Sequence, residues 1–503
     1  MLLVLFVIWS CVGLIYIHMK RRHLVNLGAK LPGPKPLPLV GNALMFIGKP
    51  ERMFRKLAIL NKKYKRMLAL WMGPKLTVLI FNAKDAEAIL KAKGTFKAEE
   101  YQFLRPWLGE SILISEGAKF KHNKKLLTPA FHSQNLKQYL KVFSEYSNKL
   151  IDELEEQVDE PEFDIQPYLS LSTMFALLET SMGVKKETLG NQTMDYIHAV
   201  ERLGRFAHER SYKVWLRPDI VFKYSKLKQE QDKYLNVVHP LTEKVIKERR
   251  REYLMNKENV NGEQIKWPVF LDKFFEATDD ETGAGLTDDE IKDEVMTMLF
   301  AGHDTTSVAI GFCLCMLGLH QNVQEKLQSE LDYVFNGMNE EVTYEDCKKL
   351  VYMDQVIQET WRLFPPIPMI GKKPQEDIPL EDCTLPSGCT TLLCIMAIHR
   401  DETQYKNAND FNPDNFLPEN IKQRNPYSFI PFSAGQRTCV GQRYAHLLIK
   451  VTLTYILRRY QVSSERPISQ YKLAGQTSLK MKNGFMISLK DRQLNNNKIT
   501  NDY

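Results

Sequence analysis

A ten-residue segment near the C-terminal end constrains the fold of this chain more than any other feature. Residues 432–441 read FSAGQRTCVG, in which Cys439 lies between two glycines. Gly435 and Gly441 allow tight turns and a close approach of the backbone to a flat ligand, and Arg437 can pair with a ligand carboxylate. An apolar helical pattern resumes directly afterwards, so we expect Cys439 just ahead of a helix N-terminus, where backbone N–H groups and the helix dipole favour a thiolate.

The remaining cysteines show no disulfide framework and no metal cluster. The 503-residue chain contains eight cysteines without a CxxC pair or a His-spaced group. This usage predicts reduced thiols in a body that faces the cytosol. A lone cysteine is usually an inert core residue, so the flanking residues are what single out Cys439.

Composition limits the class of protein. Hydrophobic residues make up 44% and charged residues 26%, and the mean hydropathy is −0.34. These values predict a soluble globular bulk and exclude a disordered chain, a collagen-like repeat and a polytopic transporter. The net charge of +7 is too small for a nucleic-acid-binding protein and suits an acidic partner or an anionic membrane.

The N-terminal segment predicts a membrane anchor. Residues 2–19 contain no Asp, Glu, Lys or Arg, and as a helix they would cross about 27 Å of hydrocarbon. Basic residues follow this stretch and none precedes it, which places the body in the cytosol. We therefore predict a transmembrane helix over 1–22 and a basic, Pro-rich hinge over 23–49. A cleaved signal peptide is the alternative, but it would carry its charge before the apolar stretch.

The rest of the chain predicts one large catalytic domain over 50–492, followed by a polar, disordered tail over 493–503. The fold class is mainly α with small β-sheets (α+β). Apolar spacings of three and four predict helices over 134–154, 168–183, 226–253, 287–319, 323–335 and 353–363. Alternating or β-branched runs predict strands over 76–81, 389–395 and 485–489.

The helix expected over 287–319 has an unusual interior. Thr287 and Glu290 form a capping box at its start. Residues 301–306 read AGHDTT and place a glycine, an acid and two hydroxyls in mid-helix, which lowers helix propensity. The flanking stretches are those of a buried central helix, so these polar residues indicate function. A solvent-facing polar patch is the alternative interpretation.

These segments together resemble the cytochrome P450 superfamily of haem-thiolate monooxygenases. Residues 432–441 match its FxxGxRxCxG motif at every fixed position, and three further motifs follow the expected order: (A/G)GxD/ETT at 301–306, ExxR at 359–362 and PxxF at 413–416. The resemblance covers essentially the whole chain and implies a single P450 fold with haem b as cofactor. Segments 101–109, 127–132, 294–306 and 431–441 look more narrowly like family 4, which includes fatty-acid ω-hydroxylases and many insect enzymes.

The resemblance assigns roles to the cysteine segment. It implies that Cys439 is the axial thiolate of the haem iron, which pushes electron density towards O–O cleavage. Phe432 would pack against the haem near the sulfur and keep it dry, and Arg437 would pair with a propionate. Gly435 and Gly441 would let the backbone approach the haem.

It also assigns roles to the opposite face of the haem. Gly302 would let the central helix lie close to the porphyrin, while Asp304 and Thr305 would relay protons to dioxygen. The segments expected to line the substrate pocket, 101–114, 298–305, 366–370 and 476–479, are mostly apolar. The resemblance therefore implies a lipophilic substrate, namely a fatty acid or related lipid, a hormone or a xenobiotic.

The ExxR pair has a structural role in this family. Glu359 and Arg362 are three residues apart on one helix face and can bond to each other. The family often adds an arginine from the PxxF segment, but here that position is Asn415, for which we expect only a neutral hydrogen bond.

Three positions depart from the family pattern. Lys124 stands where a propionate-binding arginine is usual, and Lys372 replaces the arginine that follows the ExxR helix. Lysine keeps the charge but loses the bidentate fork, so we predict a haem held by one forked contact and two point charges. Ala301 replaces a glutamate that esterifies the haem in many family 4 enzymes, which excludes that covalent bond here.

Electrons must come from a partner, because no GxGxxG follows a strand. The resemblance implies NADPH-cytochrome P450 reductase, with cytochrome b5 as an additional donor, and an endoplasmic reticulum membrane as the location. Basic residues are candidates for the docking face: Lys119, Lys121, Lys124, Lys125 and Arg443. Residues 212–217 mix aromatic, aliphatic and basic side chains and form either a contact with the membrane interface or an ordinary surface loop.

Two other functions stay open from the sequence. A haem-thiolate isomerase or peroxygenase would need no reductase, although the Asp304–Thr305 pair speaks against it. A membrane-anchored lipid-binding or haem-binding protein would carry out no turnover at all.

Overall fold

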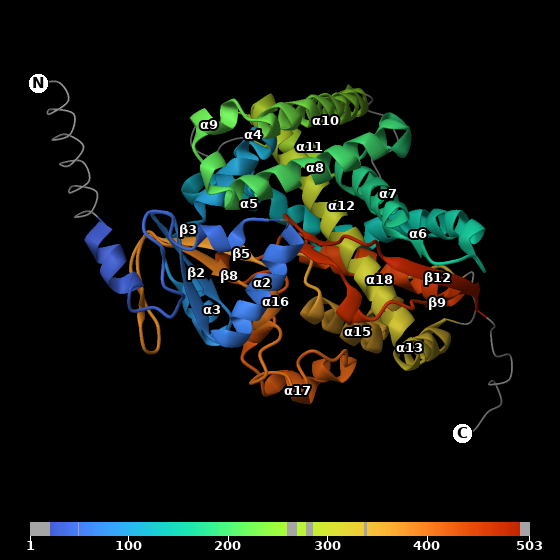
Figure 1. Ribbon diagram of the computed structural model, residues 1–503. Helices are drawn as coiled ribbons and strands as arrows, with labels where there is room; N and C mark the ends of the chain where they lie inside the picture. The colour runs from blue at the N-terminus through green and yellow to red at the C-terminus, as the bar shows by residue number, and fades with distance from the viewer. Residues whose placement is uncertain (1–20, 49, 259–268, 278–284, 336–339, 493–503) are drawn as a thin grey trace, which may run out of the picture.

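Helices dominate the computed structural model, which describes residues 21–48, 50–258, 269–277, 285–335 and 340–492. The strands of the largest sheet gather on one side of the molecule and the long helices on the other (Figure 1). Residues 1–20 of the predicted anchor and the whole predicted tail, 493–503, lie outside the described residues.

The α-helices are α2 (Pro50–Lys63), α3 (Ala83–Lys91), α4 (Arg105–Leu108), α5 (Gly117–Leu127), α6 (Ser133–Leu154), α7 (Gln166–Leu177), α8 (Gln192–Tyr212), α9 (Asp219–Lys223), α10 (Lys226–Glu258), α11 (Phe270–Glu276), α12 (Asp288–Leu319), α13 (Gln321–Val334), α14 (Tyr344–Lys349), α15 (Val351–Leu363), α16 (Ile395–Ile398), α17 (Pro418–Lys422) and α18 (Gln442–Arg459). The strands are β1 (Met67–Met72), β2 (Lys75–Ile80), β3 (Thr95–Lys97), β4 (Phe163–Asp164), β5 (Ile370–Pro374), β6 (Ile378–Pro379), β7 (Thr384–Leu385), β8 (Thr390–Leu393), β9 (Tyr460–Ser463), β10 (Leu473–Gly475), β11 (Leu479–Met481) and β12 (Met486–Asp491).

The six predicted helices and three predicted strands are all present, with shifted ends. The predicted helix over 168–183 is α7 followed by a π-helical turn, Leu178–Met182. The predicted strand over 389–395 ends at Leu393, because α16 begins at Ile395. The pattern missed β1, whose sequence MLALWM shows no polar alternation because nearly all of its side chains are buried.

The largest sheet brings together distant parts of the chain. Its strand order is β1-β2-β8-β5-β3, so β8 and β5 (orange in Figure 1) lie between the N-terminal strands β2 and β3 (blue). β3 pairs antiparallel with β5 and places Lys97 directly opposite Lys372. Cross-strand partners point to the same face of a sheet, so the two ammonium groups are neighbours.

The core is built around α12, which runs through the middle of the molecule and packs against α7, α15 and α18 (Figure 1). Its start has the expected capping box between Thr287 and Glu290. Within the part of the chain that the structure describes, α12 is the one helix long and apolar enough to cross a membrane. However, 83% of its apolar window is buried inside the protein, as expected for a core helix.

The predicted hinge over 23–49 is not a free connector. The Ala69 backbone N–H of β1 donates to the Pro32 carbonyl over 2.8 Å. The Asn42 side chain accepts from the Trp71 backbone N–H over 2.9 Å, and the Asn42 backbone N–H donates to the Trp71 carbonyl. A side chain at Gly33 would lie 2.2 Å from the Ala69 carbonyl oxygen. The Pro-rich segment is therefore bound to the edge of the sheet from about residue 31 to residue 42.

Candidate functional site

The cysteine segment forms a tight loop ahead of α18. The Cys439 backbone N–H donates to the Phe432 carbonyl over 3.0 Å, which closes the loop. Gly435 has a φ of +73°, a conformation that side chains disfavour, and a Cβ there would lie 3.1 Å from the Leu90 carbonyl oxygen. Gly441 has an ordinary φ of −85° as the N-cap of α18. Gly435 therefore adopts a turn conformation that favours glycine, whereas Gly441 has a backbone conformation open to any residue.

Cys439 keeps exposed surface, although burial dominates the surroundings of its thiol. Burial raises the pKa of the thiol, while the backbone N–H groups of Gly441 and Gln442 act in the opposite direction. The helix N-terminus favours the thiolate, as expected, but burial has the larger effect and favours the neutral thiol. A thiolate here requires a positive charge such as a metal ion.

Cys439 alone can bind only a metal ion whose other ligands come from a cofactor. Among the described residues, no three His, Cys, Asp or Glu side chains lie close enough together to hold an ion. A single accessible thiol can complete the coordination of an iron that a porphyrin already holds. On α12, Ala301 is exposed and Thr305 is partly exposed, although most neighbouring positions of this helix are buried.

A cluster of buried cations lies beside the cysteine loop. Burial lowers the pKa of Lys97 to about 7, with Arg437 and Lys372 acting in the same direction. Burial, followed by Arg437, lowers the pKa of Lys372 to about 8. Glu116 acts on both lysines; it pairs with Arg437 and accepts from the Lys97 backbone N–H over 2.7 Å. Three cations against one carboxylate leave room for two further negative charges, which the two propionates of a haem would supply.

Sequence reasoning found two members of this cation cluster, Arg437 and Lys372, and missed Lys97. Lys97 is partly exposed as a residue, but its ammonium group is buried enough for its pKa to fall. Its sequence signal was the short run TFK, which gives no sign of pairing with β5. Lys124 lies on α5 and is not part of this cluster; its Nζ donates to the Gln436 carbonyl of the cysteine loop over 2.5 Å.

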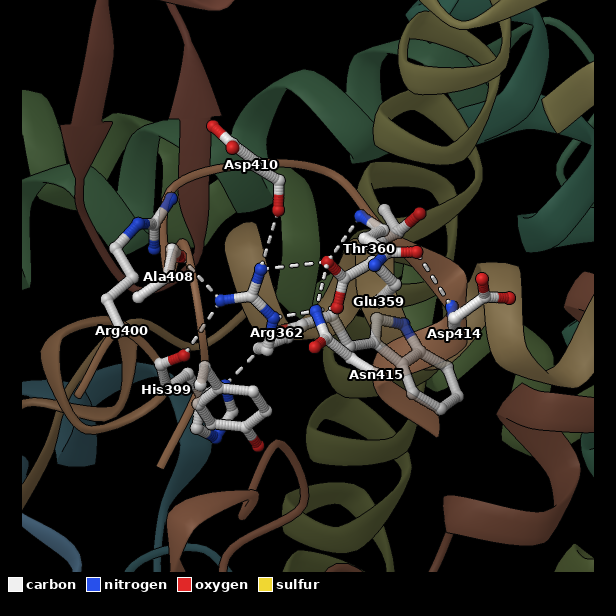
Figure 2. Close-up of polar contacts among 12 residues, drawn as sticks. Glu359, Thr360, Arg362, His399, Arg400, Ala408, Asp410, Asp414 and Asn415 are labelled. Atoms are coloured by element: carbon white, nitrogen blue, oxygen red, sulfur yellow. Dashed lines mark hydrogen bonds and ion pairs between the residues drawn. The ribbon is translucent and has the colours of Figure 1, made fainter. Parts of the chain in front are cut away.

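The ExxR pair lies at the centre of a complete hydrogen-bond network (Figure 2). Glu359 and Arg362 are fully buried and form a bidentate pair, with N–O distances of 2.7 and 2.8 Å. The guanidinium also donates to three carbonyl oxygens, those of His399, Ala408 and Asp410. Asn415 donates its amide N–H to Glu359 over 3.1 Å, so its hydrogen bond is made to a carboxylate and our expectation of a neutral bond was wrong.

The polar residues of α12 point in different directions. A Cβ at Gly302 would lie 2.7 Å from the Leu177 side chain, so this glycine allows α7 to pack closely against α12. The Thr305 hydroxyl donates to the Ala301 carbonyl over 2.7 Å. Asp304 is 6% exposed and forms a 2.5 Å ion pair with Lys480 of β11. Consecutive helical residues diverge by about 100°, so Asp304 and Thr305 do not face each other.

Comparisons with known proteins agree with this geometry. The family model described as Cytochrome P450 matches residues 31–487. Cytochrome P450 4g15 of Drosophila melanogaster is 34% identical over 95% of each chain. Cytochrome P450 4V2 of Homo sapiens is 36% identical over 90% of this chain and 88% of its own. Among solved structures, the cytochrome P450DA heme domain has the same fold, with a TM-score of 0.77 at 20% identity, covering 92% of this chain and 98% of that one.

Proposed function

Because the chain belongs to the cytochrome P450 family and is therefore a haem-thiolate monooxygenase, we propose that it oxygenates a long-chain fatty acid or related lipid at a membrane surface. Its cofactor is haem b with a thiolate ligand. We assign the thiolate to Cys439 and the propionate contacts to Arg437, Lys97 and Lys372. When bound, this cofactor supplies the chemistry that activates dioxygen.

The residues around Cys439 support this assignment. The Phe432 ring packs edge-on against Trp361, with ring centroids 4.9 Å apart, and covers the loop with apolar surface. The loop is fixed by the Cys439–Phe432 backbone bond and by the conformation of Gly435. Both features hold the sulfur in place. Alanine at position 301 excludes an ester bond between this position and the haem.

The membrane association rests on an exposed apolar surface. Leu39 is 96% exposed, and Leu44, Ile47 and Trp215 are each more than half exposed. One depression of about 140 Å³ is lined by two segments far apart in the sequence: Ala43, Phe46, Ile47 and Gly48 from the first, and Tyr212, Lys213 and Trp215 from the second. Such a surface suits the headgroup region of a bilayer. We therefore favour the membrane interpretation of residues 212–217, with the endoplasmic reticulum as the membrane and residues 1–22 as the anchor.

The electron donor is proposed to be an NADPH-dependent flavoprotein reductase, with cytochrome b5 as an additional donor. Lys121 and Lys125 of α5 and Arg443 of α18 are exposed. The Lys124–Gln436 hydrogen bond joins α5 to the cysteine loop, so these cations lie around one face near Cys439. An acidic partner docking there would bring electrons close to the thiolate, and its binding would weaken with added salt.

The observation that carries the proposal is the accessible Cys439 thiol beside a cation cluster that lacks two negative charges. The first test is the carbon monoxide difference spectrum of the reduced protein, in which Cys439→Ser should abolish the haem-thiolate signature. The second test incubates the enzyme with NADPH, the reductase and a panel of fatty acids, hydrocarbons and terpenoids, and detects products by mass. Product formed only with reductase excludes the peroxygenase and carrier alternatives; products from none of the fatty acids would contradict the lipid substrate.

A further inference from the structure

A buried carboxyl group near the start of the central helix holds an irregular segment of the chain in place. Glu294 of α12 is 3% exposed. Its Oε1 atom accepts the Ile112 backbone N–H and an amide N–H of Asn123 on α5, each over 2.6 Å. Among the described residues, its Oε2 atom has no hydrogen-bond partner in the protein. One oxygen of this carboxyl group thus makes two contacts, while the other makes none.

The same helix fixes residues 109–115, which we call the wall segment, at two further points. This segment forms neither an α-helix nor a strand. Asp293 accepts the Glu110 backbone N–H over 2.8 Å. Thr297 donates its hydroxyl to the Ser111 hydroxyl over 2.6 Å. Three side chains of α12 therefore hold the wall segment.

The wall segment also contacts the cysteine loop. Arg437 donates to the carbonyls of Ile112 and Ser115 over 3.3 and 2.7 Å. Ile112 and Leu113 are half-buried and pack against the main hydrophobic core. By family resemblance, the wall segment is also part of the expected lining of the substrate pocket. Its position therefore affects the shape of that pocket and the contacts of the cysteine loop together.

The surroundings of the Glu294 carboxyl favour its neutral form. Burial raises its pKa to about 8, and Asp293 acts in the same direction. The contacts with Ile112 and Asn123, together with the charge of Lys119, act against this rise without cancelling it. Charged groups on the neighbouring elements are engaged in ion pairs of their own: Lys119 of α5 with Glu290 of α12, Arg105 of α4 with Glu110, and Arg437 with Glu116. A neutral carboxyl keeps its carbonyl oxygen as the acceptor for both N–H groups and carries its proton on the other oxygen.

Resting on the proposed monooxygenase function, we infer that Glu294 is a positioning residue for substrate binding, which in its neutral form holds the wall segment against α12 and shapes the lipid pocket. When the carboxyl loses its proton to the solvent, a buried charge without a cationic partner is created, and such a charge requires water. Because the wall segment covers the carboxyl, hydration of this charge moves the segment away from α12. Substrate binding therefore weakens as the pH rises through the titration of Glu294.

The test compares Glu294→Gln and Glu294→Ala with a control, Glu325→Gln, which changes an exposed carboxylate on α13. Each ferric holoenzyme is titrated with dodecanol, an apolar probe without an ionisable group, from about pH 6.5 to about pH 9.5. The measured quantity is the dissociation constant, obtained from the change in the haem absorption spectrum. The carbon monoxide difference spectrum of each reduced variant verifies that it is folded around its haem.

Glutamine keeps the acceptor for both N–H groups and cannot ionise. We therefore expect Glu294→Gln to bind dodecanol as the wild type does at the lowest pH, and the wild-type dissociation constant to rise about tenfold more than that of Glu294→Gln by the highest pH. Glu294→Ala loses both contacts and should bind about tenfold more weakly at every pH. Glu325→Gln should match the wild type throughout. Lys97 and Lys372 also titrate in this interval, but every variant contains them, so the difference between the wild type and Glu294→Gln isolates Glu294.

A second readout does not depend on substrate. The infrared difference spectrum between the wild type and Glu294→Gln should show the carbonyl stretch of a protonated carboxylic acid at neutral pH, and this band should disappear at the highest pH. Absence of the band at neutral pH would overturn the inference, and so would an equal pH dependence of binding in the wild type and Glu294→Gln. If neither dodecanol nor any fatty acid changes the haem spectrum of the wild type, the lipid-substrate proposal fails. Dodecylimidazole, whose ring binds haem iron whatever the natural substrate is, then supplies the dissociation constants that decide the role of Glu294.

Discussion

Buried charge is handled differently at two places in this structure. At Glu359 and Arg362 the chain itself provides the partners: a bidentate ion pair, three backbone carbonyls, the Asn412 backbone N–H and the Asn415 amide. Around Arg437 two lysines lie buried with one carboxylate, Glu116, between them, and their pKa values fall as a result. The first group is complete within the protein and holds the fold. The second is incomplete, which is what a site for an anionic ligand requires.

The complete group should give the largest effect when it is broken. Arg362→Lys removes the forked contact with Glu359 and leaves carbonyls of the loop after α16 without donors. We expect a loss of about 3 to 5 kcal/mol of unfolding free energy, which would leave little soluble protein. Urea unfolding and soluble yield measure this. Arg251→Lys, at an exposed position of α10, is the control and should change neither quantity.

The incomplete group should respond with opposite signs in the two forms of the protein. Lys97→Met removes a cation that burial and its neighbours already disfavour, so the haem-free chain should become no less stable. The same change removes a charged contact to a propionate, and haem dissociation should become about tenfold faster. Transfer of haem to an excess of apomyoglobin measures the rate, with Lys93→Met, an exposed neighbour, as control. Destabilisation of the haem-free chain by Lys97→Met, together with unchanged haem loss, would assign Lys97 to the fold.

The pH dependence of stability should separate the two groups as well. The folded pKa of about 7 for Lys97 lies below the ordinary lysine value of 10.5, so the unfolded chain binds more protons between these two pH values. The unfolding free energy of the haem-free protein should therefore rise with pH between these two values. Urea unfolding at a series of pH values would show this slope, and Lys97→Met should reduce it. A slope that is the same in both proteins would remove Lys97 as its source.

The same comparison explains what the sequence could and could not predict. Cys439, Arg437 and the ExxR pair occur in short motifs with fixed spacing, so they could be found without a structure. The six long helices were found because their apolar periodicity is local. Lys97 and Lys480 were missed because their roles come from strand pairing with β5 and from packing against α12, contacts between segments more than 170 residues apart. Gly302 was found, but its contact with Leu177 was not, since a motif does not show which neighbour fills the space.

The smallest expected effect concerns the quality of the contacts within the incomplete group. Lys372→Arg replaces a point charge by a fork that can bind a propionate with two hydrogen bonds, so haem loss should become slower by about threefold. Lys124→Arg should act in the same direction but less, because the Lys124 ammonium already donates to the Gln436 carbonyl. The haem-transfer assay measures both variants. Because Lys372 is 8% exposed, a larger guanidinium could also disturb packing, and the urea midpoint of the haem-free Lys372→Arg chain controls for this. Slower haem loss at an unchanged midpoint supports a direct contact with the propionate. No slowing in either variant would contradict the prediction that lysine binds a propionate more weakly than arginine does at these positions.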